Sequence, residues 1–337
     1  MRKYLIFSLV FVMLLGLTSF ASASEPGKLI IWADENRLEV VTELGEEFED
    51  DYGVPVVVQE KAFGDIRDSM RVEAPSGEGP DIIVGAHDWL GELVTNGLIN
   101  PIDLSGLDDN FIDVSLDAFT WGEDTYAVPY AIESVGLIYN KDLVPNPPET
   151  FEEFRAIIKE HTDPEEEKYG FVMPQPDPFH TYPFMSAMGG YVFGVEDGVF
   201  NPDDIGLNNE GAVEGLKKLN SLYAEDYVPY LDYQTAVSLL KSGDAAMMLT
   251  GPWEFANLEE AGVNYGFAQL PSLEGQAPKP FSSVHGFMMS AFSENKMLAQ
   301  AFLRNFIARE DTMIELYEKG GRPPVYKPAI EVANEDP

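Results

Sequence analysis

The stretch Lys28–Val58, KLIIWADENRLEVVTELGEEFEDDYGVPVVV, contains two apolar runs separated by an amphipathic segment. The run at 28–32 predicts a buried strand, and the β-branched run at 54–58 predicts a second one. Between them, apolar residues at 38, 41, 44, 48 and 52 follow the spacing of one helix face, and Gly53 marks the helix end. A strand, a helix and a strand in this order favour a parallel sheet covered by helices.

The same alternation continues along the chain. Thr150, with Glu153 three residues later, forms a capping box that predicts a helix start just after Pro147-Pro148. Periodicity and stop signals predict further helices around 65–72, 88–96, 150–158, 213–223, 235–241 and 296–307, a hairpin at 121–128, and strands at 81–84, 134–139 and 245–249. This pattern fits two α/β lobes, with a ligand expected in the crevice at the carboxyl ends of the strands.

The first residues carry the pattern of an export signal. Arg2 and Lys3 precede an apolar run over 5–17, which ends in Ala21-Ser22-Ala23, the small residues that signal peptidase accepts. Because a bilayer span needs about 20 apolar residues, this shorter run is interpreted as a signal peptide over 1–23. The mature chain is expected to act in the periplasm or outside the cell. Since the chain has no cysteine, no lipid anchor is expected.

The composition argues against several classes of protein. With no cysteine and only 4 histidines, none in a metal-binding spacing, neither a metal nor another cofactor is expected. The 58 acidic residues against 21 Lys and Arg give a net charge of −37, which repels nucleic acids and anionic membranes. A dispersed acidic surface with few lysines is typical of adaptation to high salt, and an ordinary acidic protein is the alternative.

Several separated blocks of sequence identify a resemblance. They are GPDII at 79–83 with AHD at 86–88, LIYNKDLVPNPP at 137–148, GGY at 189–191, GDAAM at 243–247 running to GPW at 251–253, VNYG at 263–266 and KPF at 279–281. In this order, over nearly all of the chain after the signal sequence, they resemble the maltose- and maltodextrin-binding proteins of extracellular solute-binding protein family 1. Members of that family deliver solutes to ABC importers.

The resemblance implies a two-lobed, type II periplasmic binding protein-like α/β fold that closes around a sugar. The implied amino-terminal lobe comprises 24–131 and 286–325, and the carboxy-terminal lobe comprises 132–285 and 326–337. The second lobe is expected to be incomplete, because family members continue with further helices beyond the region matching 331–337. The expected protein is a monomer without enzymatic activity, whose partners are an oligosaccharide and the membrane subunits of an ABC permease.

A sugar site needs aromatic rings for the apolar C–H faces of the sugar and carboxylates, amides or guanidinium groups for its hydroxyls. The resemblance implies three aromatic contacts in the second lobe, from Phe179, Tyr233 and Trp253. It also implies two carboxylates there, Glu133 and Asp177, which accept hydrogen bonds from sugar hydroxyls.

The first lobe is implied to contribute polar groups. Asp88 matches a sugar-binding aspartate, and Glu35 and Arg37 stand in place of an Asp–Lys pair of the family. Gly85 lies where a tryptophan is usual and Trp89 where an arginine is usual. Trp89 either restores the aromatic contact from a neighbouring position or packs internally, and both alternatives stay open.

The residues leave the exact sugar open among maltose, longer maltodextrins, cyclodextrin and trehalose. A glycoside hydrolase is the main rival class, because Glu133 and Asp177 could act as the two carboxylates that such enzymes use. That interpretation explains none of the sequence blocks. A binding protein for a polyamine or a metal ion is a second rival, which the aromatic residues and the GPW block disfavour.

Overall fold

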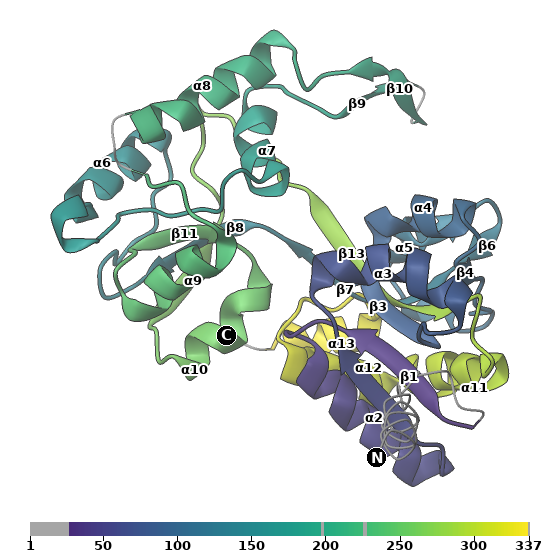
Figure 1. Ribbon diagram of the computed structural model, residues 1–337. Helices are drawn as coiled ribbons and strands as arrows, with labels where there is room; N and C mark the ends of the chain where they lie inside the picture. The colour runs from purple at the N-terminus through teal and green to yellow at the C-terminus, as the bar shows by residue number, and fades with distance from the viewer. Residues whose placement is uncertain (1–26, 197–198, 225–227, 336–337) are drawn as a thin grey trace, which may run out of the picture. The chain divides into compact units, whose positions relative to one another are not determined.

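The computed structural model describes residues 27–196, 199–224 and 228–335. The chain divides into two compact units, each with a sheet and helices (Figure 1). Within the described residues, unit 1 comprises 27–130, 285–314 and 326–329, and unit 2 comprises 131–284, 315–325 and 330–335. The predicted two-lobed α/β fold class is confirmed. The lobe boundaries given above stay a prediction, and the signal peptide over 1–23 lies outside the described residues.

The sheet of unit 1 is built around the strand–helix–strand stretch with which the chain opens. Its strands are β1 (Leu29–Ala33), β2 (Val56–Glu60), β3 (Ile82–Ala86), β4 (Ile99–Asn100), β7 (Ala127–Ser134) and β13 (Ser282–Ser290). The order is β2-β1-β3-β13-β4, with β7 also paired to β13. Strands β1, β2 and β3 are parallel, as predicted, whereas β13 returns from far along the sequence and pairs antiparallel to β3.

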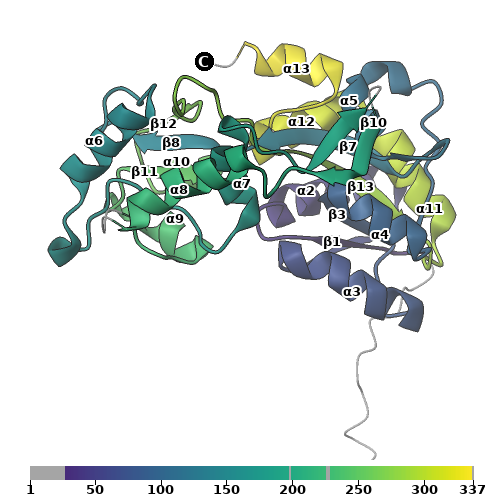
Figure 2. The same ribbon diagram turned by 90° about the horizontal axis from the view of Figure 1, so that it is seen from above.

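Helices cover both faces of this sheet. Helices α2 (Leu38–Tyr52) and α3 (Phe63–Ser76) lie on opposite sides of β1 (Figures 1 and 2). Helix α2 has the bounds predicted from periodicity. Its apolar face, including Leu44 and Phe48, is buried, and Gly53 closes it in the left-handed conformation at φ 68°.

Shorter elements complete the first part of the chain, and three helices follow β13. The shorter elements are η1 (His87–Trp89), α4 (Leu90–Thr95), η2 (Asp108–Asn110), α5 (Asp113–Ala118), β5 (Thr120–Trp121) and β6 (Asp124–Thr125). After β13 come α11 (Lys296–Ala301), its π-helical continuation η5 (Phe302–Ile307), α12 (Glu310–Gly320) and α13 (Lys327–Ala333). Over the described residues, no helix is long and apolar enough to cross a membrane.

Unit 2 is built on a three-stranded sheet, with β8 (Gly136–Asn140) between β11 (Met247–Thr250) and β12 (Tyr265–Ala268). Both pairs are antiparallel. Alternate residues along β8 enter different cores: Leu137 packs with Phe171 and Leu249, whereas Ile138 packs with Val172 and Met248. The sheet therefore separates two apolar layers.

The helices of unit 2 form these layers. They are α6 (Phe151–His161), η3 (Pro164–Glu166), α7 (Pro178–Ala187), α8 (Glu210–Ala224), α9 (Tyr233–Ser242), η4 (Pro252–Glu254) and α10 (Phe255–Glu260). Helices α7 and α8 lie against each other, and the hairpin of β9 (Phe193–Glu196) and β10 (Val199–Ile205) connects them (Figure 1). The predicted capping box is present at the start of α6.

Candidate ligand-binding site

Four partly exposed aromatic rings gather in unit 2, and we call them the aromatic cluster: Phe179, Tyr182, Trp253 and Phe281. Phe281 stacks on Tyr182 with ring centroids 4.0 Å apart and on Phe179 at 6.0 Å. Trp253 lies 6.4 Å from Phe179. The rings come from α7, from η4 and from the segment just before β13. Together they offer the apolar, flat surface that the C–H faces of a sugar require.

Asp177 sets the start of α7, and thereby the place of Phe179. Its Oδ1 accepts hydrogen bonds from the backbone N–H groups of Phe179 at 2.8 Å and His180 at 3.3 Å. Its Oδ2 lies 3.0 Å from Nδ1 of His180. Burial raises the pKa of Asp177, but the hydrogen bonds and charge of His180 and the backbone donors outweigh it, and the pKa is lowered. The carboxylate therefore stays ionised and acts as the N-cap of α7.

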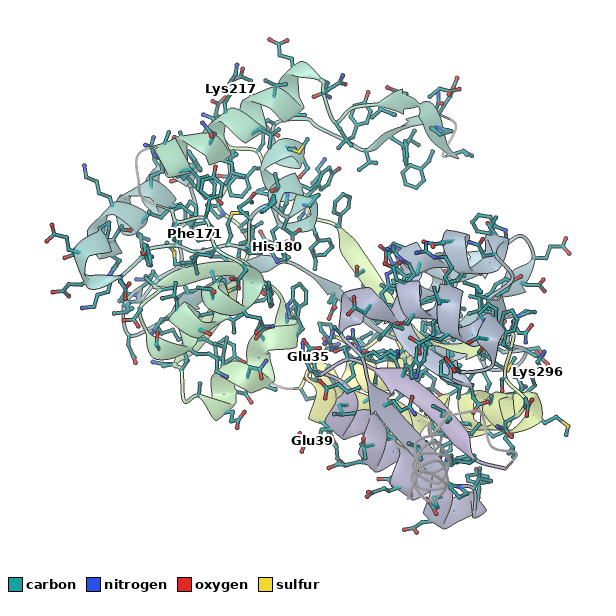
Figure 3. The ribbon with its side chains drawn as sticks, in the orientation of Figure 1. Glu35, Glu39, Phe171, His180, Lys217 and Lys296 are labelled. Atoms are coloured by element: carbon teal, nitrogen blue, oxygen red, sulfur yellow. The ribbon has the colours of Figure 1, made fainter. Side chains whose placement is uncertain are left out.

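The sequence predicts His180 as a polar group at the edge of the ligand cleft, where the family has an aromatic residue, and the structure shows it buried within unit 2. Only 5% of it is exposed, and its ring lies 6.0 Å from that of Tyr233 and 6.5 Å from that of Trp253. Figure 3 shows it inside unit 2, whereas Lys217 projects outward from α8. Within the described residues, its Nε2 makes no hydrogen bond. Its role at the edge of a ligand cleft stays a prediction.

Tyr233 and Trp253 are joined by a hydrogen bond between the indole N–H and the tyrosine hydroxyl. Tyr233 is the first residue of α9, whose N-cap Asp232 accepts from the backbone N–H of Thr235 at 2.8 Å. Trp253 is the second residue of η4, which begins at Pro252 with Gly251 as its N-cap, just after β11. The structure therefore brings together four of the five residues predicted for this lobe: Asp177, Phe179, Tyr233 and Trp253.

The fifth residue, Glu133, has an ionic partner that the sequence did not reveal. Nη1 of Arg322 lies 2.6 Å from Oε2 of Glu133, and both side chains are buried. Glu133 also lines a pocket of about 680 Å³. The rest of the lining consists of Ile132, Ser134, Val135, Gly136, Pro252, Phe267, Ala268, Gln269, Leu270, Ala277, Pro278, Pro280, Ser282 and Pro323. None of these residues belongs to the aromatic cluster.

In unit 1, Arg37 is buried in a polar network. Its Nε donates to the Tyr130 hydroxyl at 2.6 Å, and its Nη2 lies 2.8 Å from Nδ1 of His285. Its Nη1 pairs with Asp34. The guanidinium also lies over the ring of Phe63, 5.2 Å from its centroid. Arg37 therefore braces the start of α2 against β7 and β13 within this unit.

Trp89 packs inside unit 1 against Phe63, with ring centroids 4.7 Å apart and only 5% of the residue exposed. Its ring fills the space over Gly85, where a Cβ atom would lie 2.3 Å from Cζ3 of Trp89. Phe63 thus links Trp89 to Arg37. Glu35 and Asp88 are exposed, and Figure 3 shows Glu35 near Glu39 at the amino-terminal end of α2. A direct role of these four residues in ligand binding stays a prediction.

The described side chains of unit 2 combine aromatic rings with a carboxylate. No group of three or more His, Cys, Asp or Glu residues among them could hold a metal ion. Unit 2 instead presents aromatic faces beside an ionised carboxylate. This combination suits a neutral polyhydroxylated ligand.

Comparison with known proteins identifies the family. Residues 43–336 match the model of bacterial extracellular solute-binding proteins. A galactooligosaccharide-binding protein of Bacillus subtilis is 33% identical over 92% of this chain and 75% of its own length. A maltotriose-binding protein of Pyrococcus abyssi is 33% identical over 86% of this chain and 64% of its own length. A maltodextrin-binding protein of Bacillus subtilis is 30% identical over 95% of this chain and 80% of its own length. The chain therefore belongs to the family of bacterial extracellular solute-binding proteins.

Proposed function

We propose that this protein is the substrate-binding component of an ABC sugar importer and that it captures maltodextrin-type oligosaccharides. The observation that carries the proposal is the aromatic cluster of unit 2, whose partly exposed rings stand beside the ionised Asp177. Stacking on such rings and hydrogen bonding to carboxylates are the two contacts by which proteins hold a neutral sugar. The relatives named for maltotriose and maltodextrin support this class of ligand.

A galactooligosaccharide is the second candidate ligand, because one relative at 33% identity carries that name. Glucose and galactose units differ in the direction of one hydroxyl, so the aromatic faces alone would accept both. Discrimination must come from the polar groups. The residues proposed to face hydroxyl groups are Glu35, Arg37, Asp88, Glu133 and Asp177.

The protein is proposed to bind and release its sugar without cleaving it. It would act as a monomer in the periplasm or outside the cell, after removal of residues 1–23, and hand the sugar to the membrane subunits of the importer. A ligand that contacts one conformation better than another shifts the population toward it, and this gives the permease a bound form to recognise. Trehalose and cyclodextrin are the remaining alternative ligands.

The test is a titration of the purified protein with maltotriose and with a galactotriose of matched length, measured by isothermal titration calorimetry. Binding of maltotriose at micromolar or lower concentration, at least about tenfold tighter than the galactotriose, is the expected result, equal to about 1.4 kcal/mol. Chromatography of the mixture after prolonged incubation should recover intact maltotriose. Release of glucose or maltose would instead support the glycoside hydrolase. Tighter binding of the galactotriose would select the second ligand.

The variant Trp253→Ala links the titration to the aromatic cluster. Loss of one stacking ring is expected to weaken maltotriose binding by about 1–3 kcal/mol. Trp121→Ala is the matched control, because Trp121 is an exposed tryptophan in β5 of unit 1. Unchanged affinity in the Trp253 variant would remove this ring from the site.

A further inference from the structure

A buried carboxylate lies directly beside the aromatic cluster, and the proposed function does not use it. Glu254 follows Trp253 in η4 and is only 3% exposed. Its Oε1 accepts a hydrogen bond from the Tyr233 hydroxyl at 2.7 Å, and its Oε2 accepts from the side-chain amide of Asn257 at 3.0 Å. Burying a carboxylate is costly, so its hydrogen bonds are expected to serve a purpose.

The Tyr233 hydroxyl connects this carboxylate to the indole of Trp253. The hydroxyl oxygen accepts a hydrogen bond from the indole N–H of Trp253. It also lies 2.8 Å from Oγ1 of Thr250, at the end of β11. The three side chains Trp253, Tyr233 and Glu254 therefore form one hydrogen-bond chain, which we call the indole anchor.

The direction of every bond in the indole anchor is fixed by chemistry. An indole nitrogen can only donate, and an ionised carboxylate can only accept. The tyrosine must therefore accept from Trp253 and donate to Glu254. Burial and the charge of Glu254 raise the pKa of Tyr233, so the proton needed for this donation stays on the hydroxyl. Without the carboxylate, the hydroxyl proton could point elsewhere, for example toward Oγ1 of Thr250, and the hydroxyl lone pair would no longer be held toward Trp253.

We propose that Glu254 is a positioning residue that fixes the orientation of Trp253 through Tyr233, so that the indole face is held ready for a sugar ring. This inference rests on the proposed function. Because the polar edge of the indole is committed to Tyr233, only its apolar surface is left for a ligand. A ring held in advance does not have to be ordered upon binding, and this preorganisation increases affinity.

The inference assigns Tyr233 a different task from the one expected of an aromatic contact. Its hydroxyl is used within the protein, toward Trp253, Thr250 and Glu254. Tyr233 thus contributes to ligand binding indirectly, by holding Trp253 in position. The expected result is that loss of the Tyr233 hydroxyl has the same effect on the indole as loss of the Glu254 carboxylate.

The test compares Glu254→Ala, Glu254→Gln and Glu259→Ala. Glu259, an exposed residue on α10, accepts a hydrogen bond from another tyrosine, Tyr265, at 3.1 Å and serves as the matched control. The indole N–H signals of the protein are recorded by ¹⁵N–¹H NMR without sugar, and Trp253→Phe assigns the Trp253 signal. In Glu254→Ala this signal should move upfield and exchange faster with water. In Glu254→Gln it should stay near its original position, because the amide oxygen still accepts from Tyr233.

Affinity for maltotriose is then measured for the same variants. Glu254→Ala should bind about tenfold more weakly, Glu254→Gln should recover most of this loss, and Glu259→Ala should bind like the original protein. If Glu254→Ala does not fold, Glu254→Leu, which fills the space without an acceptor, replaces it. Tyr233→Phe gives the reference signal of an indole that has lost its acceptor.

An unmoved Trp253 signal in Glu254→Ala, or in Glu254→Leu if it is used instead, overturns the proposal. An equal change in Glu259→Ala also overturns it, because the effect would then be a general loss of stability. A displaced signal with unchanged maltotriose affinity overturns the link to binding. If the original protein binds none of the sugars, the proposed function fails, and the NMR comparison still decides whether Glu254 orients Trp253.

Discussion

At the residue scale, Glu133 and Arg322 form a buried ion pair. The two side chains are 6% and 3% exposed and meet at 2.6 Å. Removing two charges from water costs several kcal/mol per ion, which the attraction offsets only while both partners are present. The main effect of the pair is therefore to hold the segment around Arg322 against β7, and its net contribution to the free energy of unfolding is small.

Replacing Arg322 alone should be far more harmful than replacing both partners. Arg322→Met is expected to lower the free energy of unfolding by about 3–5 kcal/mol, because the Glu133 carboxylate stays buried without its cationic partner. The double variant Arg322→Met with Glu133→Leu should recover most of this loss. Urea unfolding followed by circular dichroism measures both. Equal losses in the single and the double variant would contradict the expectation.

Gly85 is required because the ring of Trp89 occupies the place of its side chain. A Cβ atom at residue 85 would lie 2.3 Å from Cζ3 of Trp89, and the ring is held in place by Phe63. Gly85→Ala should therefore destabilise the protein by about 1–3 kcal/mol, the usual cost of overpacking. Gly64→Ala on α3 is the control: no atom lies within 4 Å of its added Cβ. It should be neutral or stabilising in a thermal melt. A harmless Gly85→Ala would show that the ring moves freely.

At the scale of elements, the spacing of apolar residues predicted those helices that bury one apolar face and expose a polar one. Helix α2 and the capping box of α6 were found where the residues predicted them. Helix α7 was not predicted, because its sequence PFHTYPFMSA contains two prolines and is largely apolar, without a polar face. The predicted helix over 296–307 ends as the π-helical segment η5, a change of hydrogen bonding that leaves the apolar spacing similar.

The N-cap of α7 should support both stability and ligand binding. Asp177→Ala is expected to cost about 1 kcal/mol of stability and to weaken maltotriose binding, because the start of α7 positions Phe179. Thr150→Ala removes the capping box of α6 in the same unit and should cost a similar amount without changing affinity. Urea unfolding and calorimetry separate the two effects. Unchanged maltotriose affinity in Asp177→Ala would show that the N-cap has no role in ligand binding.

The pH dependence of this cap has a defined sign. The pKa of Asp177 is lowered from its ordinary value of 3.8, so the folded state binds a proton less readily than the unfolded chain. Its contribution to stability is therefore complete above about pH 4 and is lost as the pH falls through the lower, folded-state pKa. The difference in unfolding free energy between the original protein and Asp177→Ala should shrink toward low pH. A difference that grows on acidification would contradict this assignment.

At the scale of the whole molecule, sequence blocks predicted the family and the two-lobed fold, but not the pairs that hold each unit together. Glu133 and Arg322 are 189 residues apart, and Arg37 and His285 are 248 residues apart. No local spacing connects such positions. The residues of the aromatic cluster were partly predicted because they lie in recognisable blocks, whereas the role of Glu254 became visible only from its contact with Tyr233 in the structure.

The net charge of −37 predicts that salt stabilises the protein. Acidic residues outnumber Lys and Arg by 58 to 21, so repulsion between like charges opposes folding at low ionic strength. The screening length falls from about 10 Å at 0.1 M salt to about 3 Å at 1 M, which removes most of this repulsion. The unfolding free energy measured with urea should therefore rise by about 2 kcal/mol or more between 0.1 M and 2 M KCl. Sucrose of matched osmolality is the control: it favours compact states without screening charge and should reproduce only a minor part of the increase. Stability that stays constant or falls in KCl would show that the acidic residues are spaced widely enough to tolerate low salt, and the protein would then be an ordinary acidic protein.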